Sequence, residues 1–403
     1  MTKEITTVKG FQDYLPPESL KRSAVKKLIE KYFQSYGFVP IETPIIEFDA
    51  LMANENENDE AVSDGFKLKD RGDRNLGLRY EFTFQLQRIF KENPSIKLPF
   101  KRYQIGEVFR DEPISSSRFR QFTQCDADII GDSSSLADAE CLALFSDIFK
   151  TLNIQFEIQV NNRKLLTSII QSVEIAQIES VMKEIDKIEK VGADAVKLNL
   201  RKFATTNQIV TLFKLLEKEL LFFKDNAFQG IEELEELIDL CDMYGLDLKF
   251  SPFLARGLAY YTGNIFEIKS GNISIAGGGR YDSSVGKFTG RDIPAVGISM
   301  GIERVCQLAQ IPLPDLPKVL IISINQDKAA IQLAKKLRKE DISCIIQSTK
   351  ISKAMEYANS NQIPFVIFIG EEEIKFKKFK LRNMQTGEEK SLNESQLEKA
   401  LSK

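Results

Sequence analysis

Residues 100–131 constrain the fold of this chain more than any other stretch. Apolar and polar residues alternate on both flanks, as they do in half-buried strands. The centre, Asp111 to Ser117, holds a proline and consecutive serines, which are typical of a turn. The stretch therefore predicts two strands joined by a long, mobile hairpin loop.

Three arginines surround this predicted loop. Arg110 closes the first strand, and Arg118 and Arg120 open the second. Their guanidinium groups would face one volume, with a geometry suited to bidentate phosphate contacts. This spacing favours an anionic, phosphate-bearing substrate, and the alternative is a surface hairpin whose charges are solvated.

Length and composition indicate a globular protein of two or three domains, because 403 residues exceed what one hydrophobic core usually supports. Charged residues make up 28% and hydrophobic residues 43%, and no apolar run approaches the roughly 20 residues that span a bilayer. The amino terminus has no apolar secretory region, and the five cysteines form no Cys-x-x-Cys pair. We expect reduced cysteines in a cytosol-like compartment and no zinc site.

The chain contains no histidine, which excludes Ser-His-Asp and Cys-His catalysis and any imidazole metal ligand. The formal net charge of -3 gives no global attraction to polyanions, so a nucleic acid would need local basic patches. Chemistry in this chain must therefore use carboxylates, arginines, tyrosines and bound ions.

Periodicity divides the chain further. Residues 18–35 predict an amphipathic helix, residues 53–75 a polar loop, and residues 162–244 a run of helices. Three prolines between residues 312 and 317 predict a stiff linker, and a βαβαβ unit with a parallel sheet is expected beyond it. Near its end, residues 374–387 interleave basic and apolar side chains, which suits single-stranded nucleic acid or a lysine-protected edge strand.

Several segments resemble a known family. Residues 18–47, 100–131 and 297–304 (GISMGIER) are similar, in order, to the three motifs of class II aminoacyl-tRNA synthetases. Residues 255–263 (ARGLAYYTG) and 277–282 (GGGRYD) resemble the signature segments of histidyl-tRNA synthetases. The strings LRYEFT and QCDADIIG look more archaeal and eukaryotic than bacterial in style.

The resemblance implies an α+β catalytic core with an antiparallel sheet, of the class II synthetase fold. Residues 1–161 and 245–311 would form this core, and residues 162–244 a helical insertion domain. Residues 317–403 would form an α/β anticodon-binding domain.

The resemblance also implies a reaction. The family activates histidine with ATP and Mg²⁺, giving histidyl adenylate, and then transfers the histidyl group to the 3′ end of tRNA(His). Arg110, Arg256 and Arg304 would be the catalytic residues, with Arg256 near the α-phosphate. ATP would be bound by Arg110, Arg304 and the loop arginines, Arg118 and Arg120.

Six further residues match the positions that hold histidine in the family. Glu81, Thr83 and Gln124 would hold the α-amino group. Asp128 and Tyr261 would meet the imidazole, where one acceptor and one hydroxyl satisfy both ring nitrogens. Tyr260 would line the same pocket. Without the shared motif order, a lone Asp or Tyr is better read as a solvated or core residue.

Two departures from the family pattern are Ala259, where aspartate is more usual, and Ser117, where glycine is more usual. The family also implies a homodimer, and no membrane or DNA partner is expected. A second interpretation is a noncatalytic, histidine-sensing paralogue like the regulatory subunit of ATP phosphoribosyltransferase. Such proteins typically lack the anticodon-binding domain, so the segment beyond residue 317 favours the enzyme.

Overall fold

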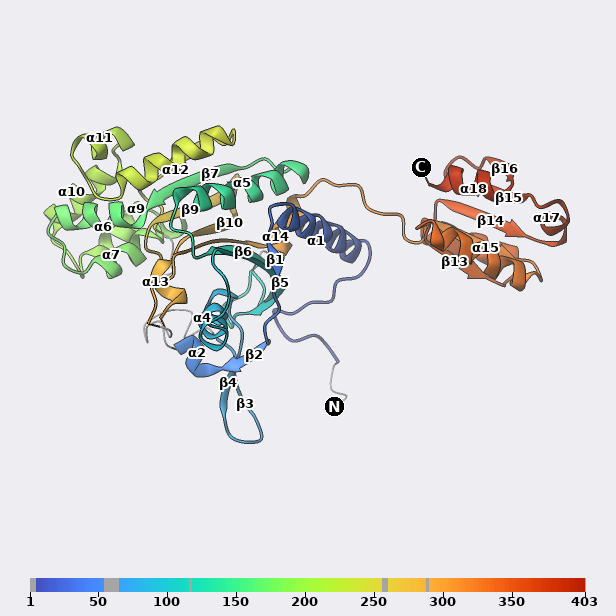
Figure 1. The fold of residues 1–403 in the computed structure, drawn as a ribbon, viewed down its shortest axis with the longest axis horizontal. Helices are drawn as coiled ribbons and strands as arrows, with labels where there is room; N and C mark the ends of the chain where they lie inside the picture. Colours follow the sequence, from blue (N-terminus) through green and yellow to red (C-terminus); the bar gives the residue numbers. More distant parts are fainter. Residues whose placement is uncertain (1–4, 54–64, 116–117, 256–259, 288–289, 403) are drawn as a thin grey trace. The chain divides into compact units, whose positions relative to one another are not determined.

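The computed structural model describes residues 5–53, 65–115, 118–255, 260–287 and 290–402. The chain divides into two compact units, Met1–Ile311 and Pro312–Lys403, and Figure 1 labels the elements of each. The division falls within the proline-containing segment. Each unit has its own sheet and its own buried apolar clusters.

The first unit is built on an eight-stranded sheet with the strand order β1-β5-β6-β11-β10-β9-β7-β8. Its strands pair antiparallel except at the two edges, where β1 with β5 and β7 with β8 run parallel. The antiparallel sheet predicted for the core is confirmed. The strands are β1 (Val39–Pro40), β5 (Phe100–Phe109), β6 (Gln121–Ile130), β7 (Glu157–Asn162), β8 (Leu248–Phe250), β9 (Asn264–Ser270), β10 (Ile273–Arg280) and β11 (Ala295–Gly301).

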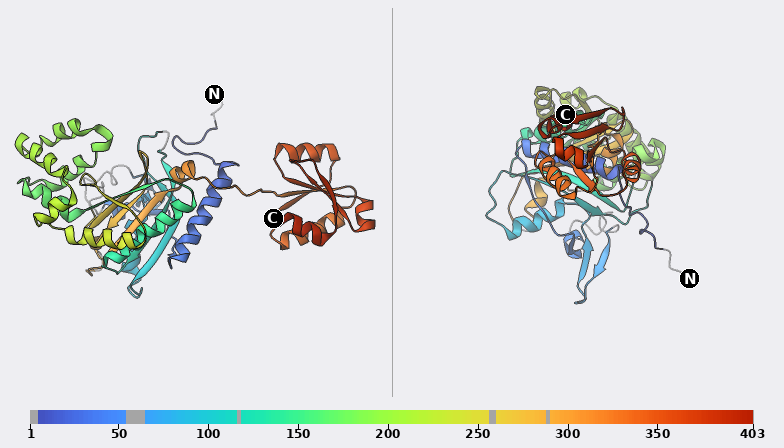
Figure 2. Two further views of the ribbon diagram at one scale, coloured as in Figure 1. Left: turned by 90° about the horizontal axis from the view of Figure 1, so that it is seen from above. Right: turned by 90° about the vertical axis from the view of Figure 1, so that its right-hand side faces the viewer.

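One face of this sheet is covered by helices α1 (Glu18–Ser35), α5 (Ser135–Thr151) and α14 (Ile302–Leu308), as Figures 1 and 2 show. Helix α1 has the bounds that periodicity predicts. Its buried stripe, Val25, Ile29 and Phe33, joins the main apolar cluster, where the Phe33 and Phe145 ring centroids lie 5.9 Å apart. Helices α4 (Thr83–Glu92) and α13 (Asp282–Val285) contribute to a separate apolar cluster.

A small antiparallel sheet extends from the core. It has the order β2-β4-β3, formed by Ile46–Phe48, Asn75–Leu78 and Lys67–Lys69, and helix α2 (Asp49–Ala53) follows β2. The prediction of a polar loop over residues 53–75 is therefore wrong for Lys67–Lys69. This short strand pairs with β4 even though all three of its residues are exposed, so burial gives no sequence signal. The rest of that prediction falls largely on residues 54–64, outside the described residues.

The helical segment predicted over residues 162–244 lies between β7 and β8. Its last helix packs against α5, and its buried residues join the main core cluster. The segment comprises α6 (Arg163–Ser172), α7 (Ile178–Ile185), α8 (Ile188–Val191), α9 (Ala193–Leu200), α10 (Thr206–Leu216), α11 (Leu220–Asp225) and α12 (Ile231–Met243).

The second unit holds a five-stranded sheet with the order β13-β12-β14-β15-β16. β12 pairs parallel with both β13 and β14, which confirms the predicted βαβαβ unit, and β15 and β16 add an antiparallel extension. Helices α15 and α18 pack on one face and α16 on the other, as the left view of Figure 2 shows. Its elements are β12 (Val319–Ser323), α15 (Asp327–Lys339), β13 (Cys344–Gln347), α16 (Ile351–Ser360), β14 (Phe365–Ile369), α17 (Glu371–Phe376), β15 (Phe379–Asn383), β16 (Glu389–Leu392) and α18 (Glu394–Leu401).

The basic segment near the carboxyl end does not form an edge strand. Lys375 lies in α17, and the strand Phe379–Asn383 pairs on both sides, with β14 and with β16. The edge-strand interpretation of this segment is therefore wrong.

Candidate active site

A cavity of about 690 Å³ opens on the face of the core sheet opposite α1 and α5. Strands β6, β10 and β11 form its floor, and Gly277, Gly297 and Gly301 line it. At Gly297 a Cβ atom would lie 2.0 Å from the Asp128 carboxylate. The missing side chain therefore leaves room for the polar groups of the neighbouring strand, which explains why glycine is needed there.

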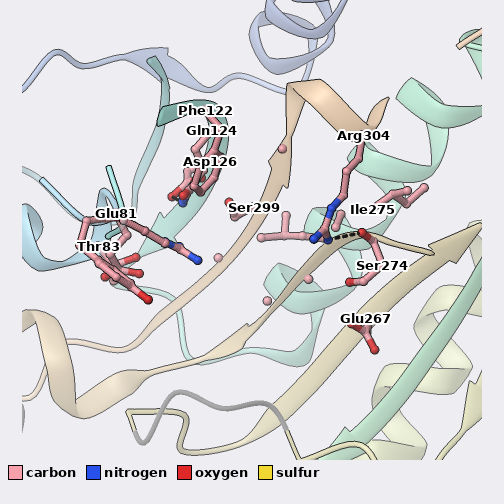
Figure 3. Close-up of a pocket in the computed structure, with 18 of the residues that line it drawn as sticks. Glu81, Thr83, Phe122, Gln124, Asp126, Glu267, Ser274, Ile275, Ser299 and Arg304 are labelled. Carbon is pink, nitrogen blue, oxygen red and sulfur yellow. Dashed lines mark hydrogen bonds between the residues drawn. The ribbon is translucent and has the colours of Figure 1, made fainter. Parts of the chain in front are cut away.

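Three polar side chains of β6 project into this cavity. Gln124, Asp126 and Asp128 are spaced two residues apart, so they share one face of the strand, and each is at least nine-tenths buried. The Gln124 amide donates to both Asp126 carboxylate oxygens, at 2.9 and 3.0 Å. Figure 3 shows Gln124 and Asp126 along one wall of the cavity, with Ser299 beside them.

Burial gives these carboxyls unusual proton affinities. It raises the pKa of the Asp126 carboxyl from 3.8 to about 6, although the Arg102 guanidinium works in the opposite direction. Burial also raises the pKa of Asp128, and both Arg102 and the Tyr281 hydroxyl oppose this shift. The cavity therefore presents a carboxylate pair whose charge depends on its neighbours.

The remaining residues predicted for histidine line the same cavity from other segments. Glu81 and Thr83 line it at the start of α4, together with Tyr260 and Tyr261. The Tyr260 hydroxyl donates to a Glu81 carboxylate oxygen over 3.3 Å. The Tyr260 and Tyr261 ring centroids lie 5.0 Å apart, so the two tyrosines form one aromatic wall.

Among the predicted arginines, Arg110, Arg118 and Arg304 line the same cavity. The Arg110 guanidinium lies over the Tyr80 ring at 4.3 Å and the Phe122 ring at 5.1 Å, and cation–π contact holds it in place. Arg118 pairs with Glu112 at 3.3 Å. Arg304 Nη1 donates to the Ser274 carbonyl oxygen at 2.7 Å, which Figure 3 shows across from Gln124.

Two predicted arginines are not placed in the cavity. Arg120 does not appear among its lining residues; it pairs with Asp111 at 3.1 Å, and its side chain packs against Gly10. Arg256 lies outside the described residues, as do the two departures at Ser117 and Ala259. The roles predicted for Arg120 and Arg256 stay predictions.

Sequence reasoning missed several polar residues at this site. Asp126 could have been found, because it alternates with Gln124 and Asp128 on a predicted strand. Arg102 pairs with Asp128 at 2.6 Å across the hairpin, and Tyr281 donates its hydroxyl to the same carboxylate. These two contacts depend on strand pairing and on a distant loop, which local pattern does not give.

The helical segment also reaches the cavity. Asp186, directly after α7, and Lys190, in α8, both line it. Glu267 of β9 also lines it, and its carboxylate lies 3.4 Å from Lys269. The cavity therefore offers both cationic and anionic groups, which is the pattern expected for a zwitterionic substrate beside a polyanion.

The antiparallel sheet, the arginine-lined cavity and the separate carboxyl-terminal unit define a class II aminoacyl-tRNA synthetase. Residues 10–305 match the family described as histidyl-tRNA synthetase, and residues 318–403 match the anticodon binding domain. The chain belongs to the histidyl-tRNA synthetase family.

Curated relatives agree with this assignment. The chain is 40% identical to histidine–tRNA ligase 1 of Bacillus anthracis, over 96% of this chain and 97% of the relative. It is 34% identical to histidine–tRNA ligase of Helicobacter pylori strain P12, over 94% and 93% of the two chains.

Solved structures extend the likeness to the fold. The histidyl-tRNA synthetase of Nostoc sp. PCC 7120 superposes with a TM-score of 0.86 at 28% identity, over 99% of each chain. A protein of Bacillus halodurans titled as an ATP phosphoribosyltransferase regulatory subunit/histidyl-tRNA synthetase superposes at 0.74, covering 89% of this chain and 97% of its own. Since its identity is 20%, this second likeness concerns the fold alone.

Proposed function

We propose that this protein is a histidine–tRNA ligase, which activates L-histidine with ATP and transfers the histidyl group to the 3′ end of tRNA(His). The observation that carries the proposal is one cavity shared by two sets of residues. Arg110 and Arg304 suit a triphosphate, and Gln124, Asp128 and Tyr261 suit histidine. Membership of the histidyl-tRNA synthetase family supports the same conclusion.

ATP enters as the phosphate-bearing substrate of this cavity. Arg110 is the arginine proposed for the α-phosphate, because the Tyr80 and Phe122 rings fix its guanidinium. Arg304 and Arg118 are proposed for the rest of the triphosphate, and Arg256 for the α-phosphate beside the histidine carboxylate. Fixed cations of this kind stabilise the charge that develops on phosphorus oxygens in the transition state, so no histidine side chain is needed.

Magnesium is proposed to accompany the triphosphate. In the part of the chain that the structure describes, no cluster of three or more acidic or cysteine side chains is arranged to hold a metal. Phosphate oxygens and waters would therefore supply most of the ligands, as is usual for magnesium, with the Glu267 carboxylate at the cavity wall as a protein group. When bound, the ion would neutralise charge on the pyrophosphate that leaves.

Histidine is proposed to lie over the glycine floor. Glu81, Thr83 and Gln124 would hold its α-amino group, and Tyr260 orients Glu81 through the hydroxyl contact at 3.3 Å. Asp128 and Tyr261 would face the imidazole, an acceptor and a hydroxyl for the two ring nitrogens. A site of buried polar groups rejects amino acids that leave those groups unpaired.

The proposal also covers tRNA binding, the oligomeric state and the cellular location. The second unit, which matches the anticodon binding domain, is proposed to contact tRNA(His) through basic residues such as Lys375, Lys378 and Lys380. A homodimer and a cytoplasmic location are proposed from family membership. None of the helices that the structure describes is long and apolar enough to cross a membrane.

A histidine-sensing regulatory subunit is the second candidate, since a protein whose title names such a subunit shares the fold. The match of residues 318–403 to an anticodon binding domain favours the ligase. The presence of Arg110 and Arg304 in the cavity favours the ligase as well, since a sensor needs no groups for a triphosphate.

Aminoacylation tests the proposal. Purified protein is incubated with labelled histidine, ATP, magnesium and a transcript of tRNA(His), and acid-precipitable label is counted. We expect an ATP-dependent histidyl ester whose formation is lost when Arg304 is replaced by alanine. A chain that binds histidine yet charges no tRNA would move the assignment to the sensor.

A further inference from the structure

Arg102 is the largest fully buried side chain of the described residues, and it lies on β5 beside Asp128 of the proposed histidine pocket. In the hairpin register it stands opposite Asp128, and its Nη2 atom lies 2.6 Å from the Asp128 carboxylate. Its Nε and Nη1 atoms have no hydrogen-bond partner within the described ranges. A buried guanidinium with so few partners is costly, so a purpose besides stability is expected.

The Asp128 carboxylate is fixed from three directions. Arg102 pairs with one oxygen, and the Tyr281 hydroxyl donates to the other. On the neighbouring strand β11, Gly297 stands opposite Asp128, and a Cβ atom there would lie 2.0 Å from the same oxygen that Tyr281 contacts. The carboxylate therefore has one defined position, with the cavity as its remaining open side.

Arg102 also affects the ionisation of Asp128, because it is the buried cation beside two buried carboxyl groups. The ionisable groups that act on Asp128 are Arg102, Asp126, Tyr281 and the buried Cys141 of helix α5. Two carboxyls thus share one buried cation, and burial disfavours the charged form of both. Without Arg102, the two carboxyls would hold protons at higher pH, and the acceptor strength of Asp128 would fall.

We propose that Arg102 is a positioning residue for histidine recognition, which holds Asp128 ionised and fixed so that its carboxylate accepts the imidazole N–H of the substrate. The inference rests on the proposed function, because it concerns the amino acid that the cavity takes. Arg102 does not touch the substrate, since it is fully buried and does not line the cavity. Its effect passes through Asp128.

The test uses histidine-dependent ATP–pyrophosphate exchange by the full chain, with KM measured separately for histidine and for ATP between pH 6 and 9. For Arg102→Met we expect KM for histidine to rise about 10- to 100-fold, the value of a lost charged hydrogen bond. KM for ATP should change less than about twofold, and the defect should lessen as pH rises and Asp128 regains its charge. Arg102→Lys, which keeps the cation, should recover part of the affinity.

A matched control comes from the same unit. Arg280 is also buried and pairs with buried Asp138, but neither residue lines the cavity. Arg280→Met therefore removes a buried ion pair outside the cavity, together with the Arg280 contacts to Asp282 and to the Asp132 and Ser134 carbonyl oxygens. It should lower thermal stability without a selective change in KM for histidine.

A double-mutant cycle covers the case in which Arg102→Met does not fold. Arg102→Met combined with Asp128→Asn removes both members of the ion pair and leaves Asp126 as the remaining buried carboxyl. In the Asp128→Asn background the Arg102 substitution should add nothing to KM for histidine. An equal rise in both KM values, or an additive effect in the cycle, would overturn the proposal. Wild-type protein without histidine-dependent exchange would instead overturn the proposed function, and the Arg102 proposal with it.

Discussion

The Arg22 guanidinium on helix α1 lies 2.8 Å from the Glu303 carboxylate at the start of α14. Glu303 precedes Arg304, and it also accepts the Thr123 backbone N–H at 3.1 Å, one residue before Gln124. A single buried carboxylate therefore joins three segments: the first helix, the strand of the histidine pocket and the helix that carries Arg304. The three motifs recognised in the sequence meet at this residue.

Breaking this ion pair should destabilise the first unit. Arg22→Met leaves Glu303 buried with its charge uncompensated, and we expect a loss of about 3 kcal/mol in the free energy of unfolding. Urea denaturation followed by circular dichroism measures it. Lys26→Met on the same helix is the control, because Lys26 lies 4.0 Å from Glu107 in a partly exposed pair that should contribute less than about 1 kcal/mol. Equal losses in the two variants would refute this account of the pair.

Replacing Arg110 should slow the activation step. In Arg110→Ala the cavity loses a cation held by two aromatic rings, and adenylate formation should fall about 10²- to 10³-fold, as when one preorganised donor is removed. Exchange kinetics with saturating histidine measure the effect. Arg74→Ala provides the comparison, because Arg74 pairs with Asp70 on the surface, outside the cavity, and should leave the rate near that of the wild type.

The glycine floor makes a steric prediction. Gly297→Ala places a methyl group where the Asp128 carboxylate lies, so the carboxylate must shift and KM for histidine should rise at least about tenfold. Gly301→Ala on the same strand should disturb histidine binding far less, because nothing lies within 4 Å of its Cβ position. Similar effects of the two substitutions would mean that the position of Asp128 does not decide affinity.

The raised pKa of Asp126 predicts a pH-dependent stability. A carboxyl with a pKa of about 6 in the folded chain and 3.8 when unfolded favours folding at low pH, and this advantage is lost as pH rises through 6. Asp126→Asn removes the ionisation, so relative to wild type the variant should gain stability from about pH 4 to pH 6 and keep that gain above. Melting temperatures at pH 4.5 and pH 7.5 measure this. A difference between Asp126→Asn and wild type that does not change with pH would contradict the assigned burial effect.

The local pattern of apolar and polar residues was enough to predict many of the helices and strands. The apolar spacing of Val25, Ile29 and Phe33 predicts α1, and period-two alternation predicts β5 and β6 with the loop between them. Both signals are local, because each lies within one element or one hairpin, although β6 itself is buried on both faces from Thr123 to Ile130. Strand β3 escaped prediction because its residues are all exposed and its order comes from pairing with β4.

The residues of the site also fall into those that the sequence identified and those that it did not. Glu81, Thr83, Gln124 and Asp128 were identified by motif resemblance, and the structure brings them to one cavity with Tyr261. Arg102 and Tyr281 were not identified. Their contacts with Asp128 span 26 and 153 residues of sequence, so they depend on the hairpin register and on tertiary packing.

The most direct test of the central claim is ATP–pyrophosphate exchange by the purified chain without tRNA, with each of the twenty amino acids supplied separately. The account predicts exchange with histidine and none above background with the other nineteen. Exchange driven by another amino acid and not by histidine would contradict it.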